Sequence, residues 1–214
     1  MKPLLVLAAF PVVLMGWASC SHSGTGHAAL PDPRAVDKSV PEYKNPFHPS
    51  TYAHFVARKD YRKTYDVYKD DTLLNRQPKK SRKIFVCLDE QRGQYLVDGL
   101  VAMDFPLSSG VKAYPTKTGD YAVISKKEDH TSNLYGKMYD AEGKCINYNA
   151  ESTDPIPEGG RFDGSPMPYW QRLTNAGLGL HVGKVRRHPV SHGCVRLPRN
   201  VAEILYRQTS IGRS

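Results

Sequence analysis

A short stretch near the C-terminus, Ser191 to Leu197, concentrates the reactive side chains of this chain. It reads Ser-His-Gly-Cys-Val-Arg-Leu and contains Cys194, and a second histidine, His181, lies upstream. A cysteine with a histidine nearby is equipped for nucleophilic catalysis, because the histidine removes the thiol proton and the thiolate attacks a carbonyl carbon. Backbone N–H groups beside the cysteine can hold the oxyanion that forms. The stretch therefore predicts a thiolate enzyme.

The residue types alone leave two histidines as candidate bases. His192 is two positions before Cys194, so in an extended loop the two side chains would lie on the same side. Ser191 is expected to fix a histidine tautomer through a hydrogen bond. Gly193 permits a tight turn, and the N–H groups of Gly193 and Cys194 are candidate oxyanion donors.

The elements that must position these groups are short strands separated by turns. Asp98-Gly99 is a strong hairpin signal, and residues 200–208 have the apolar spacing of a short helix. This pattern predicts a mainly β, compact and sheet-rich domain. The expected strands are Ile84–Leu88, Gln94–Val97, Leu100–Phe105, Tyr121–Ser125 and Gly177–His181, the last of which would deliver His181 to the site.

The segment from Asp129 to Phe162 departs from the strand pattern. It carries many Tyr, Asn, Gly and Pro residues and shows little periodicity. A long irregular segment inside a domain is often a lid or a binding loop, so a long lid-like loop is expected here.

The first 20 residues predict an export signal. Lys2 precedes an uncharged apolar run from Leu4 to Trp17, which is too short for a comfortable membrane span. The small residues before Cys20 resemble a bacterial lipobox, in which that cysteine becomes lipidated, although Trp17 stands where an aliphatic residue is usual. Ordinary cleavage near Ser19 and an uncleaved anchor are the alternatives. All three predict a protein outside the cytoplasm.

Residues 21–83 are expected to connect this signal to the domain. Residues 21–49 are rich in Ser, Gly, His and Pro, a composition typical of a tether. Residues 51–83 mix aromatic and basic side chains and form either a short helical arm packed on the domain or a surface for an anionic partner. Packing is favoured, because aromatic residues at near-helical spacing are usually buried. The domain that carries the reactive residues then spans 84–208.

Composition limits the partners and the compartment. The chain has 214 residues, of which 40% are apolar, enough for one globular domain with extensions. A formal charge of +9 favours a nucleic acid, an anionic membrane or a cell-wall polymer as partner, or else a solvated basic surface. Cys87 and Cys145 could pair in an oxidising compartment, but Cys87 lies in an apolar run and a buried free thiol is favoured.

Two of these motifs resemble those of a known family. Gly179–His181 followed by Ser191–Leu197 resembles the signature of the L,D-transpeptidase catalytic domain family. Phe105–Gly110 and Met167–Trp170 are similar to the family's strand end and to the segment before its histidine strand. The resemblance covers roughly Ile84–Arg207. The chain departs from the family pattern in three places that bear on loop shape. The spacer before Cys194 is short, residues 116–119 lack a proline, and Val182 stands where a small residue is more usual.

The resemblance implies a sheet-rich β-sandwich with a few short helices and a specific reaction. In this family the cysteine attacks a peptidoglycan stem tetrapeptide and releases D-alanine. The acyl group then passes to an amine, which forms a 3–3 crosslink or attaches a wall-anchored protein. With water as acceptor the same site is an L,D-carboxypeptidase or amide hydrolase. The resemblance implies no cofactor, no metal and no nucleic acid. The expected location is the periplasm or cell envelope, where a lipid anchor would hold the protein on the membrane.

The family pattern also assigns roles to residues of this chain. It implies Cys194 as nucleophile and His181 as base, with His192 as a second candidate that orients or polarises. Arg196 either holds a substrate carboxylate or braces the loop. Tyr169 and Trp170 either contact substrate or belong to the core. A basic rim is expected from Lys184, Arg186 and Arg187.

Three other interpretations stay open at this point. A papain-like peptidase is disfavoured, because its cysteine usually precedes its histidine. A non-catalytic wall-binding lipoprotein would carry a degenerate site. A zinc site would use His181, His188, His192 and Cys194, but these residues lack the paired Cys-x-x-Cys spacing of such sites.

Overall fold

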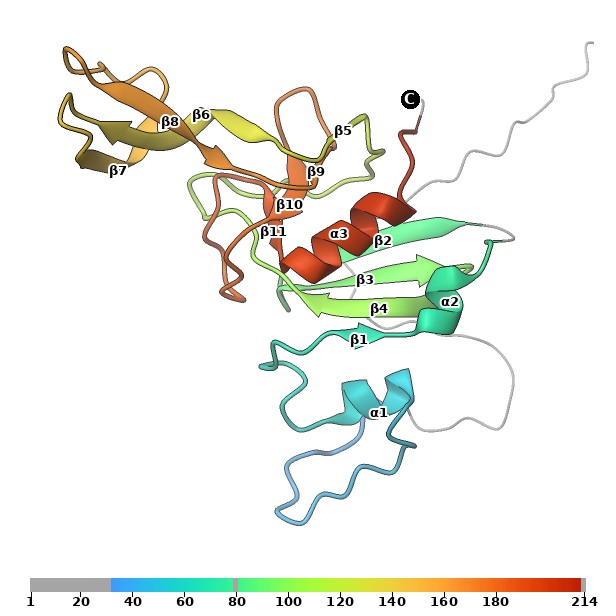
Figure 1. Cartoon of the computed structure of the whole chain (residues 1–214). Coiled ribbons are helices and arrows are strands. Elements are labelled where there is room, and N and C mark those ends of the chain that lie inside the picture. Colours follow the sequence, from blue (N-terminus) through green and yellow to red (C-terminus); the bar gives the residue numbers. More distant parts are fainter. Residues whose placement is uncertain (1–31, 79–80, 213–214) are drawn as a thin grey trace, which may run out of the picture.

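The first sheet has four strands and follows the N-terminal helix in the chain. The computed structural model describes residues 32–78 and 81–212. Within it, the antiparallel order is β1 (Tyr68–Lys69), β4 (Leu100–Pro106), β3 (Arg92–Val97) and β2 (Arg82–Cys87) (Figure 1). The turn between β3 and β4 is Asp98-Gly99 with φ of 52° and 84°. Two positive φ values are those of the hairpin turn that this dipeptide favours, so the predicted hairpin is confirmed.

The second sheet carries the reactive residues. Its order is β11 (Val195–Leu197), β10 (Gly179–Val182), β9 (Trp170–Arg172) and β5 (Ser125–Lys127), and β10 and β11 run parallel. The helix α3 (Arg199–Gln208) follows β11 directly. The strand predicted to deliver His181 and the C-terminal helix are confirmed. The strand predicted over residues 121–125 is wrong, because only Ser125 of that range belongs to a strand.

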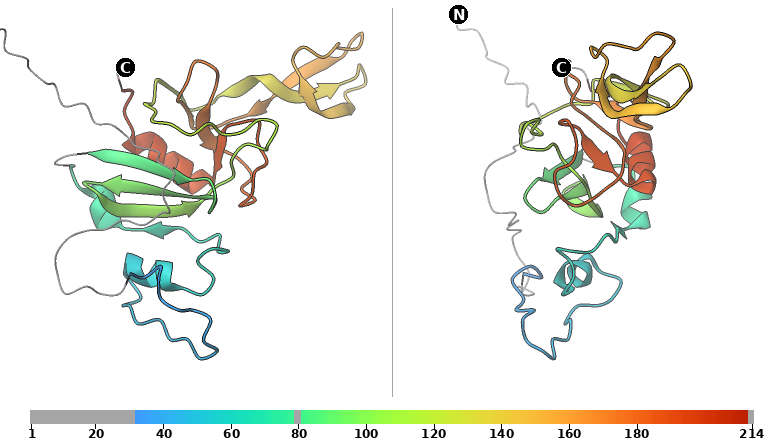
Figure 2. Two further views of the ribbon diagram at one scale, coloured as in Figure 1. Left: turned by 180° about the vertical axis from the view of Figure 1, so that it is seen from behind. Right: turned by 90° about the vertical axis from the view of Figure 1, so that its left-hand side faces the viewer.

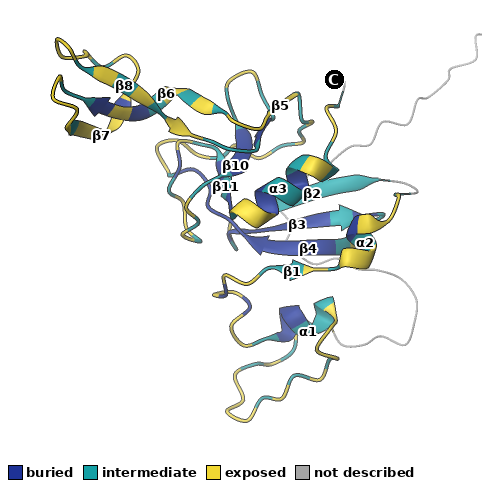
Figure 3. Cartoon of the chain, viewed as in Figure 1, coloured by how far each residue is buried: buried dark blue, intermediate teal, exposed yellow. Residues whose placement is uncertain are grey.

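The main core lies between the first sheet, the second sheet and α3. Phe105 from β4, Leu197 from β11 and Leu205 from α3 are each at most 1% exposed and belong to one apolar cluster. Figure 3 shows the buried residues concentrated in β3, β4 and the inner side of α3. Burial of this continuous surface is the main stabilising contribution, at about 25 cal/mol for each Å² of apolar area. The expected mainly β class is confirmed.

A third sheet replaces the loop expected between residues 129 and 162. Its antiparallel order is β7 (Cys145–Glu151), β6 (Thr131–Tyr139) and β8 (Arg161–Pro166). The two views of Figure 2 agree that it projects away from the body of the molecule. The expectation of a long irregular loop is therefore wrong, although part of this sheet does border the cavity described below.

The physical reason for that error is the exposure of the third sheet. Both of its faces are largely exposed, so its strands show little apolar alternation, and the buried positions are few: Gly136, Met138 and Ala150. A side chain at Gly164 would lie 1.9 Å from a backbone oxygen of the neighbouring strand, so glycine permits the close pairing of β6 and β8. Strand pairing here depends on backbone approach more than on apolar pattern.

Residues 32–78 form a folded arm that includes β1. The helices α1 (Tyr52–Ala57) and α2 (Asp71–Asn75) flank β1, and Phe55 and Tyr61 pack edge to face with ring centroids 5.7 Å apart. The predicted packing of the aromatic arm is confirmed. The described part of the expected tether, residues 32–49, also packs on α1. Side chains from it donate to the last carbonyls of that helix: Lys38 to Val56, Tyr43 to Ala57 and Asn45 to His54.

A buried ionic cluster joins the arm to the first sheet. Asp104 on β4 is fully buried and lies 2.6 Å from Nε of Arg92 on β3, which is 2% exposed. The hydroxyl groups of Tyr52 and Tyr61 donate to the second carboxylate oxygen of Asp104 at 2.7 and 2.8 Å. The Arg92 guanidinium also donates to the Thr64 carbonyl at 3.1 Å. Arm and sheet therefore share one network.

Replacing Asp104 by asparagine is expected to destabilise the protein by about 3–5 kcal/mol, because the Arg92 charge is then buried without its carboxylate counter-ion. Urea unfolding of the protein measures the change. The matched control is Asp163→Asn, which breaks an exposed ion pair with Arg161 and should cost less than about 1 kcal/mol. Equal midpoint shifts in the two variants would contradict a stabilising role for the cluster.

The described residues bear on the predicted cysteine pairing and on membrane-spanning helices. No disulfide joins Cys87 to Cys145, and Cys87 on β2 is half-buried rather than fully buried. No helix in this part of the chain is long and apolar enough to span a membrane. The predicted export signal and the predicted lipidation site, Cys20, lie outside the described residues.

Candidate functional site

The parallel pairing of β10 and β11 brings the two reactive residues together. The register pairs Leu180 with Val195 and His181 with Arg196. Leu180 and Val195 belong to the main core. Because successive strand residues point to opposite faces, His181 and Arg196 point away from that core. Cys194, one position before β11, joins them on the same face.

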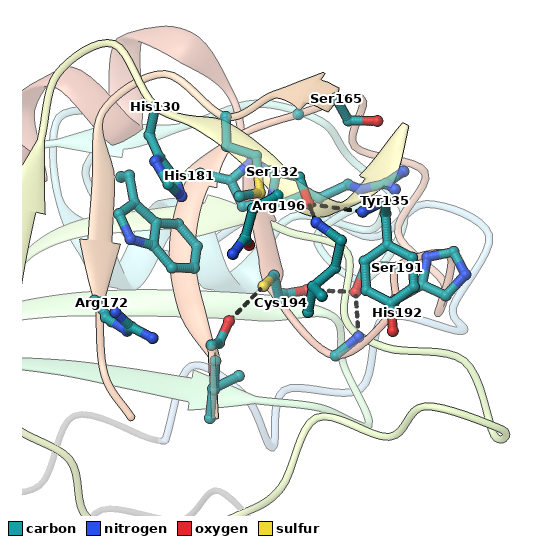
Figure 4. A pocket seen from close by; sticks show the side chains of 18 of the residues that line it. His130, Ser132, Tyr135, Ser165, Arg172, His181, Ser191, His192, Cys194 and Arg196 are labelled. Atoms are coloured by element: carbon teal, nitrogen blue, oxygen red, sulfur yellow. Dashed lines mark hydrogen bonds between the residues drawn. The ribbon is translucent and has the colours of Figure 1, made fainter. Parts of the chain in front are cut away.

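That face forms the floor of an open cavity of about 940 Å³. Figure 4 shows its side chains converging from β10, β11, β9 and the third sheet. Cys194, His181 and Arg196 line the cavity from the floor, and Tyr135 and Tyr148 line it from the third sheet. The volume is in the range of small-molecule and peptide sites.

His181 is held in one tautomer by its own strand. Its Nδ1 lies 2.8 Å from the Val182 carbonyl oxygen, which can only accept, so Nδ1 carries the proton and Nε2 keeps its lone pair. The residue is 6% exposed. Burial lowers the pKa of His181 to about 4, and the Arg196 charge acts in the same direction. His181 is therefore a neutral imidazole at pH 7, with a free acceptor nitrogen.

Cys194 is a neutral thiol in this state. Burial raises its pKa, and the Gly179 backbone and the Arg196 charge oppose that shift without overcoming it. The thiol donates to the Gly177 carbonyl at 3.3 Å. A neutral thiol and a neutral imidazole on the same face of the cavity favour proton transfer during attack over a pre-formed thiolate.

The loop before Cys194 is fixed by a second set of contacts. Ser191 Oγ donates to the Cys194 carbonyl at 2.5 Å and accepts from the Gly193 N–H at 3.2 Å. Thr116 Oγ1 donates to the Gly193 carbonyl at 2.6 Å and accepts from the Gly110 N–H at 2.8 Å. The expectation that Ser191 bonds a histidine through its side chain or backbone is wrong. Its hydroxyl closes the loop, its N–H donates to the Ser109 carbonyl, and its carbonyl accepts from the Val111 N–H. The Gly193 N–H is already engaged, which leaves the Cys194 N–H as the candidate oxyanion donor.

His192 does not lie beside the cysteine. Gly193 has φ of 112°, so the loop is turned rather than extended at that point. The His192 ring instead stacks on Tyr135 at 4.2 Å and contacts Tyr114 at 4.8 Å. Figure 4 shows it pointing away from the Cys194 thiol. The structure thus separates the two candidate bases and leaves His181 on the floor of the cavity.

The two aromatic candidates have different places. Trp170 is 5% exposed and lines the cavity between two histidines, 6.0 Å from the His181 ring and 5.1 Å from the His130 ring. Gly179 permits this, since a Cβ there would lie 2.5 Å from the indole. Tyr169 packs on Tyr206 of α3 at 5.6 Å and does not line the cavity. A substrate contact of Tyr169 is therefore not supported, because its side chain faces the helix.

The expected basic rim is only partly formed. Lys184 lines the cavity, and Arg186 is exposed outside its lining. Arg187 turns inward, with φ of 56°, and donates to the carbonyls of Thr64 and Glu90. The prediction that Arg187 belongs to the basic rim is wrong, because its guanidinium hydrogen-bonds the arm at Thr64.

The comparisons with known proteins bear on this geometry. The family model described as the L,D-transpeptidase catalytic domain matches residues 81–214. The chain belongs to this family. No curated relative matches it.

Solved L,D-transpeptidases resemble the chain only distantly. One from Stackebrandtia nassauensis is 23% identical, with a TM-score of 0.44 over 64% of this chain and 55% of its own. One from Mycobacterium smegmatis is 22% identical, with a TM-score of 0.45 over 61% and 56%. A mutant of the Enterococcus faecium enzyme is 26% identical, with a TM-score of 0.44 over 62% and 47%. The chain thus matches about half the length of these proteins.

Several residues of this L,D-transpeptidase domain were missed by sequence reasoning. Thr116 was noted only for a missing proline, yet it braces the cysteine loop. Ser108 accepts from the N–H groups of Arg186 and Arg187 and so fixes the spacer between histidine and cysteine. His130 lay in the segment interpreted as irregular. Two of them carried a sequence signal: Thr116 through its place in the Thr-x-Thr-Gly run, and Ser108 through its place in Phe105–Gly110.

The zinc interpretation finds no support in this site. Among the described residues, no group of three or more His, Cys, Asp or Glu side chains is placed to hold a metal ion. His188 is exposed in the spacer and His192 stacks on tyrosine, so neither converges on Cys194.

Proposed function

We propose that the protein is a peptidoglycan L,D-transpeptidase, in which Cys194 is the nucleophile and His181 the base. The observation that carries the proposal is the parallel pairing of β10 and β11, which sets His181 and Cys194 on one cavity-facing surface. Family membership over residues 81–214 supports the reaction type.

The first half-reaction transfers an acyl group to the enzyme. Nε2 of His181 takes the thiol proton as Cys194 Sγ attacks the carbonyl carbon of the amide before the terminal D-alanine. The Cys194 N–H donates to the oxyanion. When the tetrahedral intermediate collapses, the C–N bond breaks, the His181 proton passes to the leaving nitrogen, and D-alanine departs. The stem tripeptide remains as a thioester on Cys194.

Arg196 is proposed to hold a carboxylate of the donor peptide. Its guanidinium is half-buried and lines the cavity beside Cys194. Within the described residues, no ion pair involves Arg196. A partly buried cation that lacks a protein counter-ion is well suited to a carboxylate ligand, which guanidinium groups bind in bidentate fashion. Trp170 would form the apolar wall beside that ligand.

We propose a location in the cell envelope from the export signal predicted in the first 20 residues. An exported protein, anchored in the cell envelope through a lipid on Cys20, would meet peptidoglycan directly. The family then also permits a wall-anchored protein as acceptor, and water as acceptor would give an L,D-carboxypeptidase.

Incubation of the protein with a disaccharide-tetrapeptide tests the proposal. We expect release of D-alanine, an adduct of the stem tripeptide on the tryptic peptide that carries Cys194, and crosslinked dimers, all followed by mass spectrometry. Tripeptide without dimers would instead identify the hydrolase. Absence of both D-alanine release and the adduct would identify a wall-binding protein without catalysis.

A further inference from the structure

The spacer between the proposed base and the proposed nucleophile, residues 183–190, is held by the N-terminal arm. The arm lies outside the part of the chain that the family model matches. From the arm, the Tyr65 hydroxyl donates to the Arg186 carbonyl at 3.2 Å. In the other direction, Nη1 of Arg187 donates to the Thr64 carbonyl at 3.1 Å. Two hydrogen bonds therefore join the arm to the spacer.

Arg187 is held in this spacer by its backbone as well as by its side chain. Its φ of 56° is unfavourable for a residue with a Cβ and persists only where the surroundings enforce it. The buried hydroxyl of Ser108 accepts from the Arg187 N–H at 3.1 Å and from the Arg186 N–H at 2.7 Å. Nη2 of Arg187 donates to the Glu90 carbonyl at 3.1 Å. The side chain does not line the cavity, so any effect on the reaction must act through the spacer.

The carbonyl that binds Arg187 in the arm is itself fixed by the buried ionic cluster. The Thr64 oxygen also accepts from Nη1 of Arg92 at 3.1 Å, since a carbonyl has two lone pairs and can serve two guanidinium groups. Arg92 is in turn anchored by Asp104 at 2.6 Å. The Thr64 N–H donates to the Asp60 carbonyl at 2.7 Å, which closes the turn around it. The arm thus presents a rigid acceptor to the spacer.

The second carbonyl bound by the same guanidinium leads to the cysteine loop. Glu90 precedes Gln91, whose side-chain amide donates to the Ser109 hydroxyl at 2.7 Å and accepts from the Ser109 N–H at 2.9 Å. The Ser109 carbonyl accepts from the N–H groups of Val190 and Ser191 at 2.8 and 3.0 Å. The Ser191 hydroxyl closes the loop that carries the nucleophile. One side chain therefore connects the arm, the spacer and the support of that loop.

We propose that Arg187 is a positioning residue for the nucleophile, and that arm residues 60–66 belong to the scaffold of the active site. The inference rests on the proposed transpeptidase function. Arg187 acts by holding the spacer so that the Cys194 thiol meets Nε2 of His181 in the geometry needed for proton transfer. A misplacement of reacting groups by an ångström costs about 10²-fold in rate, so a loosened spacer should slow the chemical step.

Arg187→Ala in the full chain tests the inference. It leaves a Cβ at the strained position and removes only the guanidinium. We expect kcat for D-alanine release from the disaccharide-tetrapeptide to fall by about 10–100-fold, with KM within about twofold of the wild-type value. The matched control is Arg186→Ala, which removes the same charge from the neighbouring exposed side chain outside the cavity lining and should keep the wild-type kcat.

Free guanidinium ions separate positioning from folding stability. Added to Arg187→Ala at concentrations too low to unfold the protein, they can bind the vacated carbonyls of Thr64 and Glu90. They should restore part of the lost kcat, whereas the same concentration of sodium chloride should not. Neither salt should raise the kcat of the wild-type protein. A loss of rate caused only by unfolding would not be reversed in this way.

Tyr65→Phe tests the arm side of the contact. It removes one hydroxyl from an exposed ring, so the fold should be kept. We expect kcat to fall by about two- to fivefold, the loss typical of one hydrogen bond, and this variant decides the question if Arg187→Ala does not fold. Wild-type kcat in either variant, an equal loss in Arg186→Ala, or a loss in Arg187→Ala that guanidinium does not reverse would overturn the inference. Absence of D-alanine release by the wild-type protein would instead refute the proposed function.

Discussion

Cys194→Ala is expected to abolish D-alanine release from the disaccharide-tetrapeptide, a loss of at least about 10⁴-fold, because the thioester can no longer form. The fold should be unaffected. The hydrogen bond from Ser191 Oγ is made to the Cys194 backbone carbonyl, which alanine retains. Mass spectrometry of released D-alanine, together with the urea midpoint of the variant, measures both effects.

The matched control for this prediction is Cys145→Ala. Cys145 lies at the start of β7 on the projecting sheet and does not line the cavity. Within the described residues, its thiol donates a hydrogen bond only to the Asn147 carbonyl, at 3.6 Å. This variant should release D-alanine at the wild-type rate. Wild-type release by Cys194→Ala would show that another group is the nucleophile.

Features that depend on neighbouring residues were predictable from the sequence. The Asp98-Gly99 hairpin follows from the backbone freedom of that dipeptide. The helix α3 follows from its apolar spacing, with Val201 and Leu205 fully buried. The residue types of Ser191–Leu197 and His181 indicated nucleophilic catalysis by a cysteine, because these residues lie close together in the sequence.

Features that depend on distant pairing were not predictable. Tyr52 and Asp104 are far apart in the sequence, and no local pattern signals that a tyrosine of the arm bonds a buried carboxylate of β4. The third sheet lacks alternation because it projects from the body and is exposed on both faces (Figure 3). The direction of His192 depends on one backbone angle at Gly193, which residue types do not fix. Each of these features depends on contacts or backbone geometry that the order of residue types does not specify.

His181→Asn is expected to lower the rate of D-alanine release by about 10²–10⁴-fold, the usual contribution of a positioned base. Asparagine can keep a donor toward the Val182 carbonyl in place of Nδ1–H, but it has no basic nitrogen in place of Nε2. The control is His188→Asn in the exposed spacer, whose ring lies outside the cavity lining and whose loss should not change the rate.

The pH dependence of the wild-type protein separates a base from a merely structural histidine. Because the pKa of His181 is lowered to about 4, the neutral, basic form persists as the pH falls well below 6.5. The acylation rate at pH 5.5 should therefore remain above about half its value at pH 7, whereas a histidine of ordinary pKa 6.5 would leave only about a tenth. His181→Asn should remove this acid limb along with the rate. A wild-type limb near pH 6.5, or one that survives in His181→Asn, would mean that the proton is taken by a more exposed group than the buried imidazole beside Cys194.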